Sequence, residues 1–171
     1  MITVQSFSLT DLRKVIADTL ELPITEVVRE NEAHSVANSA FITAGVSFED
    51  TLSYGDSKWD PVNETMVYST DWEVTVDINA YGKNSQAILK KLISCMRQVH
   101  TTKLALRKIN LGFVSHTAIR DLSAMALPTW EERAHVSINL WCTHKIQSNQ
   151  KRIDIVRVAI SDEMQRVDIE V

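Results

Sequence analysis

Histidines, cysteines and clustered carboxylates are the residues of this 171-residue chain that could carry catalysis or hold a metal. The five histidines lack the spacing of a helical zinc motif, and the two cysteines add no ligand pattern. The four glycines also lack the Gly-x-Ser-x-Gly spacing that presents a catalytic serine. Nothing brings Asp121 and the pair Glu131-Glu132 together, so we interpret them as solvated turn charges. The sequence therefore predicts no enzyme, no metal and no cofactor.

The segment Gly82-Lys83-Asn84-Ser85 follows an alternating stretch and precedes a helical one, which is where a phosphate-binding loop lies. A full loop needs another glycine five residues earlier, and that position is Asp77. We therefore interpret the segment as a strand-to-helix turn in which the Asn84 or Ser85 side chain caps the helix.

A local basic stretch begins on the exposed side of the predicted helix at Lys90, Lys91 and Arg97, and it continues through residues 103–108. The chain as a whole is acidic, with a net charge of −4, and the stretch lacks interleaved aromatic residues on which bases stack. We favour a solvated helix face over a nucleic-acid interface.

Three tryptophans, Trp59, Trp130 and Trp141, fall in predicted loops or on the outward face of a predicted strand. Exposed tryptophan is common at protein interfaces and rare on a lone monomer. Two interpretations fit these three residues equally well: they contact another chain, or loops of the same chain cover them.

Composition indicates a soluble globular protein, with 44% hydrophobic and 23% charged residues. The length suits a single domain over residues 1–171, without internal repeats or linkers. The N-terminus has no signal-peptide layout and no apolar run is long enough to span a bilayer, so we expect a cytoplasmic protein that does not enter membranes. Cys95 and Cys142 look like small buried hydrophobes, and the sequence does not decide whether they pair.

The clearest pattern lies between Thr70 and His100, where a strand, a turn and a helix follow one another. Every second residue from Trp72 to Ala80 is apolar, while Glu73, Thr75, Asp77, Asn79 and Tyr81 fall on the other face. The helix that follows has one apolar stripe at 3.6-residue spacing, formed by Ile88, Leu89, Leu92, Ile93, Met96 and Val99.

The rest of the chain predicts further elements on both sides of this pattern. A helix capped by Ser8 or Thr10 runs to about Glu21, where Pro23 ends it. Residues 49–65 form a long loop that is mobile until assembly, or else a wide hairpin between the flanking strands. The other predicted elements are strands at 26–30, 39–48, 109–115, 134–143, 153–160 with a bulge, and 167–171, a polar link at 100–106, a short helical or irregular piece at 121–125, and a polar turn at 147–151.

These elements predict an α+β fold in which two amphipathic helices cover one face of a mostly antiparallel sheet. The other face is either wet or part of an assembly. His135 and Asp77 can meet there, and cross-strand polar pairing explains such a contact without an active site. The predicted residues of this second face are Glu73, Thr75, Asp77, His135, Ser137 and Asn139.

Two stretches of this sequence resemble the bacteriophage neck and tail terminator proteins. The first is a strand that ends in Tyr81-Gly82 and leads through a polar turn into a helix. The second runs from Leu127-Pro128 through a few polar residues to Glu132-Arg133 and an alternating strand. The strands at 39–48 and 153–160 lie where that family places its own. Residues 23–35 and the tail after Ser161 depart from the family pattern.

The resemblance implies a virion protein of the tail and neck, assembled in the host cytoplasm, without enzymatic activity or cofactor. It implies a ring, expected to be hexameric, that caps the tail tube and joins it to the head connector, with DNA passing through. We expect Glu73 and Asp77 to face the lumen or an interface, where like-charge repulsion would let DNA slide. The alternatives are a head–tail connector or another minor tail protein and, more remotely, a small nucleic-acid-binding module.

Overall fold

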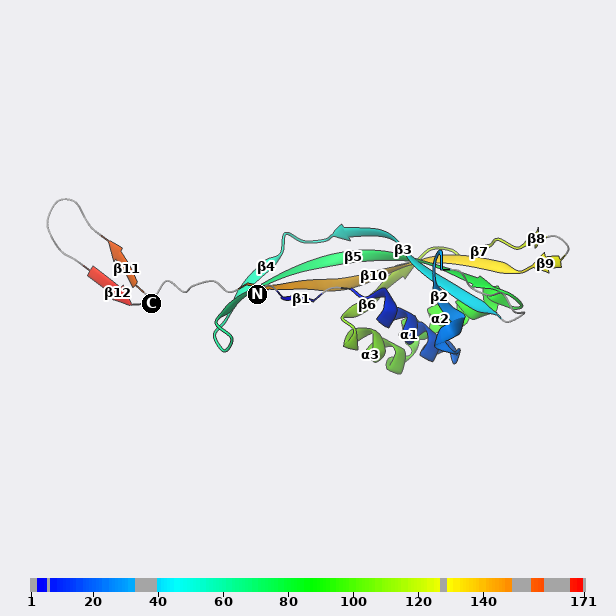
Figure 1. Ribbon diagram of the computed structural model, residues 1–171, viewed down its shortest axis with the longest axis horizontal. Coiled ribbons are helices and arrows are strands. Elements are labelled where there is room, and N and C mark those ends of the chain that lie inside the picture. The colour runs from blue at the N-terminus through cyan, green and yellow to red at the C-terminus, as the bar shows by residue number, and fades with distance from the viewer. Residues whose placement is uncertain are drawn as a thin grey trace.

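The computed structural model describes residues 3–5, 7–32, 40–126, 129–148, 155–158 and 167–170. Within these residues, three α-helices lie on one side of an eight-stranded sheet (Figure 1). The pair formed by β2 (Val27–Arg29) and β3 (Phe41–Thr51) is parallel, whereas the other pairings of this sheet are antiparallel. The predicted α+β class with a mostly antiparallel sheet is confirmed.

The sheet is built around two long strands, β5 (Thr65–Tyr81) and β10 (Arg133–Ser148), which pair in unbroken register along β10. On the β5 side lie β3, then β2, and further along β4 (Asp56–Asp60). On the β10 side lie β1 (Thr3–Gln5), β6 (Leu111–His116) and β7 (Arg120–Asp121). Separate two-stranded pairs are formed by β8 (Ala124–Ala126) with β9 (Thr129–Glu131) and by β11 (Ile155–Val158) with β12 (Val167–Glu170).

The core lies between the central strands and the helices α1 (Leu9–Leu20), α2 (Ser85–Gln98) and α3 (His100–Lys108). Because side chains alternate along a strand, every second residue of β5 and β10 points toward the helices. Fully burying a large apolar side chain contributes about 1.5–3 kcal/mol. The core residues with no exposed surface are Leu12, Ile16, Val27, Ile42, Ala44, Val76, Ile78, Ala80, Leu89, Leu92, Met96, Ala134, Val136, Ile138 and Leu140.

The first helix begins and ends as the sequence predicts. The Ser8 side chain accepts a hydrogen bond from the Asp11 backbone N–H at 3.3 Å and thereby caps α1. Glu21 takes a left-handed conformation (φ 60°) and ends the helix two residues before Pro23. A 3-10 turn, η1 (Ile24–Glu26), then leads into β2, which confirms a short strand in this region.

The loop predicted at residues 49–65 is wrong over most of its length, and the alternative hairpin is closer. Strand β3 continues to Thr51, the chain leaves the sheet over residues 52–55, and β4 pairs again with β5. A tight turn at residues 61–64 joins β4 to β5. Asp60 orders this turn, because its carboxylate accepts hydrogen bonds from the backbone of Val62 and from Asn63. These bonds lower the pKa of Asp60.

Three other predictions also need correction. The polar link at 100–106 is instead helix α3, held by the buried residues Thr102 and Leu106. The predicted strand at 39–48 contains a bulge between Val46 and Phe48. The bulge moves Phe48 away from the face of Ile42 and Ala44 and places Phe48 opposite Thr75. The piece at 121–125 contains the ends of two short strands rather than a helix. The predicted turn at 147–151 begins inside β10, and its remainder lies outside the described residues, as do the side chains of the predicted bulge at 153–160.

Candidate interaction surface on the open sheet face

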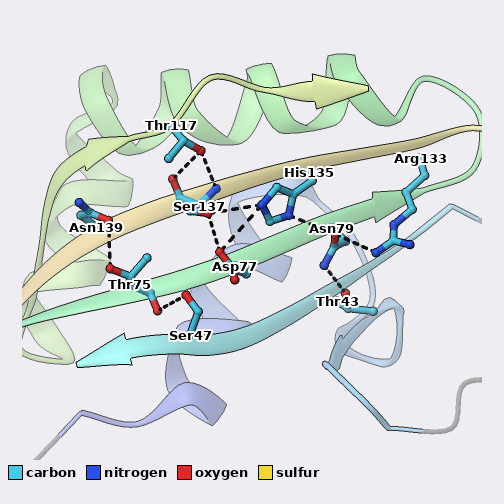
Figure 2. A network of polar contacts seen from close by, with 10 residues as sticks. All are labelled: Thr43, Ser47, Thr75, Asp77, Asn79, Thr117, Arg133, His135, Ser137 and Asn139. Carbon is cyan, nitrogen blue, oxygen red and sulfur yellow. Dashed lines mark hydrogen bonds and ion pairs between the residues drawn. The ribbon is translucent and has the colours of Figure 1, made fainter. Parts of the chain in front are cut away.

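We call the side of β3, β5 and β10 that faces away from the helices the open face. Ten polar side chains and backbone groups on this face and on its β10 edge form the contacts drawn in Figure 2, with the helices behind the sheet. Most of these residues are half-buried, while Asn79 is buried and Ser47 and Thr117 are exposed. The network members are Thr43, Ser47, Thr75, Asp77, Asn79, Thr117, Arg133, His135, Ser137 and Asn139.

The centre of the network joins β5 and β10. Ser137 lies directly opposite Asp77, and its hydroxyl donates to the Asp77 carboxylate at 2.5 Å. His135 Nε2 lies 3.4 Å from the Ser137 hydroxyl and 4.0 Å from Asp77 Oδ1. His135 and Asp77 therefore meet across the strands, as the alternation predicts.

The amide of Asn79 extends the network toward the end of β10. Its oxygen accepts from the Arg133 guanidinium at 3.2 Å and lies 3.2 Å from His135 Nδ1. Its NH₂ group donates to the Thr43 hydroxyl on β3 at 3.3 Å. Asn79 is 4% exposed, so these contacts satisfy an amide that would otherwise be buried without partners.

Serine, histidine and aspartate are together here, but their arrangement is not that of a hydrolytic triad. In a triad the histidine takes the serine proton, and the carboxylate orients the histidine. Here the Ser137 proton points to the Asp77 carboxylate, and an amide oxygen contacts His135 Nδ1. Among the described residues no three His, Cys, Asp or Glu side chains lie together in a way that could hold a metal ion. The arrangement supports cross-strand adhesion and polar recognition rather than acyl transfer.

The open face becomes acidic next to this network. Glu73 lies between Asp50 on β3 and Trp141 on β10 in the strand register. Like charges directly opposite each other destabilise a sheet, and no cation lies within 4.0 Å of either carboxylate among the described residues. Trp141 is 38% exposed beside them. The fold thus brings Glu73, Asp77 and Trp141 of the predicted surface residues to one face.

The other two predicted tryptophans lie elsewhere. Trp59 is half-buried in β4, opposite Met66 near the hairpin turn. Trp130 belongs to β9, and its side chain lies outside the described part of the structure.

The three predicted basic residues lie in three different surroundings. Lys90 lines a hollow together with Asp121 and Glu132. The Lys91 ammonium lies 3.8 Å from a Glu21 carboxylate oxygen on α1. Arg97, at the far end of α2, lines a separate cavity with residues of α3 and β6.

The residues that carry the family resemblance meet where β5 ends and β10 begins. The backbone N–H of Gly82 donates to the Glu132 carbonyl at 2.9 Å, and the N–H of Asn84 donates to the Glu132 carboxylate at 2.7 Å. The Arg133 guanidinium lies over the Tyr81 ring, 4.9 Å from its centroid. We call this cluster the β5–β10 junction.

The junction corrects two predictions. Asn84 takes a left-handed conformation (φ 67°) and its side chain does not cap α2, so the Glu132 carboxylate takes that place. Glu132 is therefore not a solvated turn charge. Asp121 is also structured, since it accepts hydrogen bonds from Ser123 and Gln86, and these bonds lower the pKa of its carboxyl. The signal for the Glu132 contact was the pair Glu132-Arg133 before an alternating strand, but only the register shows what it contacts.

Both cysteines are free thiols. Cys142 is buried in β10 and Cys95 is half-buried on α2, and burial raises the pKa of the Cys142 thiol.

Comparison with known proteins identifies the family. The family described as phage neck terminator protein matches residues 10–164, which is nearly the whole chain. The chain therefore belongs to the phage neck terminator family and is a structural protein of the phage tail and neck. No curated protein matches it significantly. The part of the chain that the structure describes contains no helix long and apolar enough to cross a membrane.

Proposed function

We propose that this protein forms a ring of identical subunits that caps the phage tail tube and joins it to the head connector. The family match over residues 10–164 carries this proposal. The open face supports it, because it combines a polar network with unpaired acidic residues and an exposed tryptophan, and none of the three helices covers it (Figures 1 and 2). Such a face is suited to a lumen or to contact with other chains.

The acidic half of the open face would determine how the proposed ring interacts with DNA. In a ring whose lumen is lined by this face, Glu73 and Asp77 would repel the phosphate backbone, and DNA would pass without being held. Asp50 and Asp71 add to the same charge, since both lie on the same face as Glu73 by the register. The DNA contact is non-specific in this proposal.

The ring is tested by light-scattering mass over a concentration series, with negative-stain images, in the presence and absence of purified tail tubes and of portal assemblies. We expect closed rings of uniform size, bound to the tube ends, and we expect these rings to be hexamers. A protein that stays monomeric and does not bind the tubes would contradict the proposal. Binding to portal alone would favour a head–tail connector, and salt-sensitive DNA retention by the monomer would favour a nucleic-acid-binding module.

The lumen is tested by Glu73→Lys, which reverses one charge at a residue whose side chain makes no hydrogen bond or ion pair among the described residues. Because Asp50 lies opposite, the new lysine gains an ion-pair partner and folding should not suffer. We expect slower DNA ejection from particles that carry this variant. Asp18→Lys on α1 is the matched control, since it makes the same charge change on the helical side. Equal ejection by both variants and the wild type would refute the acidic lumen.

A further inference from the structure

A cavity of ≈ 320 Å³ lies where the end of α2, helix α3 and strand β6 meet. We call it the basic groove. Its lining includes three exposed cations, Arg97, Lys103 and Arg107. Leu106 and Leu111, which are 1% and 2% exposed, also line it. The volume is near the lower end of the roughly 300–1,000 Å³ typical of binding pockets.

The positive charge of the basic groove is not compensated within the chain. None of its three cations has a carboxylate within 4.0 Å among the described residues. The sequences of α2 and α3 contain no aspartate or glutamate at all. Val114, at 55% exposure, adds an apolar side chain to the lining. The groove thus fits a ligand that is both acidic and apolar.

Such a ligand exists on the chain itself, in residues 48–56, which we call the acidic segment. It contains three carboxylates and three exposed apolar side chains. Exposed apolar groups that cluster in this way mark contact sites. The carboxylates are Glu49, Asp50 and Asp56, of which Asp50 lies on the open face opposite Glu73 and leaves Glu49 and Asp56 for the groove. The apolar residues are Phe48, Leu52 and Tyr54, which are 57%, 55% and 111% exposed.

The acidic segment is held in place rather than loose. The Leu52 backbone N–H donates to the Asp71 carbonyl at 2.8 Å, and the Asp71 N–H donates to the Ser53 hydroxyl at 3.3 Å. These contacts keep residues 52–55 beside β5 while the Tyr54 side chain projects. A segment that is already ordered loses less conformational entropy on binding.

The groove and the segment lie at opposite edges of the sheet. Strand β6, which lines the groove, pairs with β10, whereas β3, which carries the segment, pairs with β5 on the other side. A contact between opposite edges of two copies is head-to-tail, and head-to-tail contacts close into rings when the rotation allows. We propose that the acidic segment of one subunit binds the basic groove of the next, with Tyr54 and Leu52 as apolar anchors. This inference rests on the ring of the proposed function and names the surfaces that join its subunits.

Cysteine cross-linking tests the contact directly. In a Cys95→Ser background, one preparation carries Tyr54→Cys and a second carries Val114→Cys, and the two are mixed and oxidised. We expect a disulfide-linked heterodimer, detected by mass spectrometry, in at least tenfold excess over a control mixture of Tyr54→Cys with Met125→Cys. Met125 is the matched control because it is 70% exposed, on β8 away from the groove. Equal yields from the two mixtures would overturn the proposal.

Charge reversal gives an independent test. Arg107→Glu alters only the groove and Glu49→Lys only the segment, so each alone should weaken assembly at least tenfold. An equimolar mixture should assemble again, because each altered surface meets its complement and each unaltered surface meets an unaltered one. Both residues are exposed, and neither side chain makes a hydrogen bond or ion pair among the described residues, so folding should be retained, as circular dichroism would verify.

The outcomes separate this inference from the proposed function. Rings that persist in both single variants, without selective cross-linking, would refute the groove contact while the proposed ring would still stand. Selective cross-linking and rescue by mixing, with no ring on tail tubes, would support the contact between segment and groove. The same result would refute the proposal that the ring caps the tail tube. A third outcome is that Arg107→Glu abolishes DNA binding while Glu49→Lys has no effect on assembly. This outcome would show that the groove binds nucleic acid and would overturn the proposal.

Discussion

The β5–β10 junction gives the sharpest prediction, because one carboxylate takes the place of the expected helix cap. Glu132 accepts a hydrogen bond at 2.7 Å from the Asn84 N–H, at the N-terminus of α2. A negative charge at this end of a helix contributes about 0.3–1 kcal/mol through the helix dipole. The hydrogen bond adds about 0.5–1.5 kcal/mol net. Glu132→Gln should therefore lose only the charge contribution, and Glu132→Ala should lose both, about 0.8–2.5 kcal/mol.

The free energy of unfolding from urea titration, followed by circular dichroism, measures these losses. For a chain of this length about 1 kcal/mol corresponds to a shift in Tm of about 2–4 °C, so thermal unfolding provides a second readout. Glu131→Ala is the matched control, since Glu131 is the adjacent glutamate and its side chain makes no hydrogen bond or ion pair among the described residues; its backbone pairs with Ala124 and is unchanged by the substitution. If the Glu131→Ala and Glu132→Ala proteins lose equal stability, the capping role of Glu132 is refuted.

Three further predictions concern the backbone, the core and the thiols. Gly82→Ala should cost about 1–3 kcal/mol in calorimetry, because φ is +89° and the new Cβ would lie 3.1 Å from Ala40 Cα; unchanged stability would show that the turn relaxes. Leu140→Ala, at a fully buried site, should lower the free energy of unfolding by about 2–5 kcal/mol in urea titration, and a loss below 1 kcal/mol would contradict tight packing there. A maleimide at neutral pH should modify Cys95 before Cys142, since burial raises the Cys142 pKa and keeps its thiol protonated; equal rates by mass spectrometry would refute this.

Much of the fold follows from local periodicity. The alternation from Trp72 to Ala80 predicted which face of β5 is buried, and the 3.6-residue stripe predicted the buried side of α2. Helix α3 was missed because only two of its nine residues, Thr102 and Leu106, are buried, which leaves a weak apolar stripe in a polar stretch. Strand β4 was missed because Asp56–Asp60 is polar and ends beside Pro61, which is typical of a loop.

Of the candidate surface, the sequence predicted that Glu73 and Asp77 share one face with residues of the second long strand, and the strand register places Ser137 opposite Asp77 and Trp141 opposite Glu73. The sequence did not predict that Asp50 lies opposite Glu73, because the bulge at residues 46–48 shifts the β3 register and local alternation cannot reveal such a shift. The sequence predicted a basic stretch that includes Arg97 and residues 103–108, but not the hollow they line, since that hollow depends on a helix that the sequence did not predict.

The sequence by itself determined the class of fold, the buried faces of β5, β10 and α2, and the resemblance to phage terminators. These properties depend on residue types at short fixed spacings, which backbone geometry converts directly into faces. Only the tertiary structure decided that Glu132 caps α2, that Arg133 covers Tyr81, and that the acidic segment and the basic groove lie at opposite edges of the sheet. Each of these arrangements involves residues far apart in the chain. Their meeting depends on strand order and register, which are properties of the folded chain rather than of any local pattern.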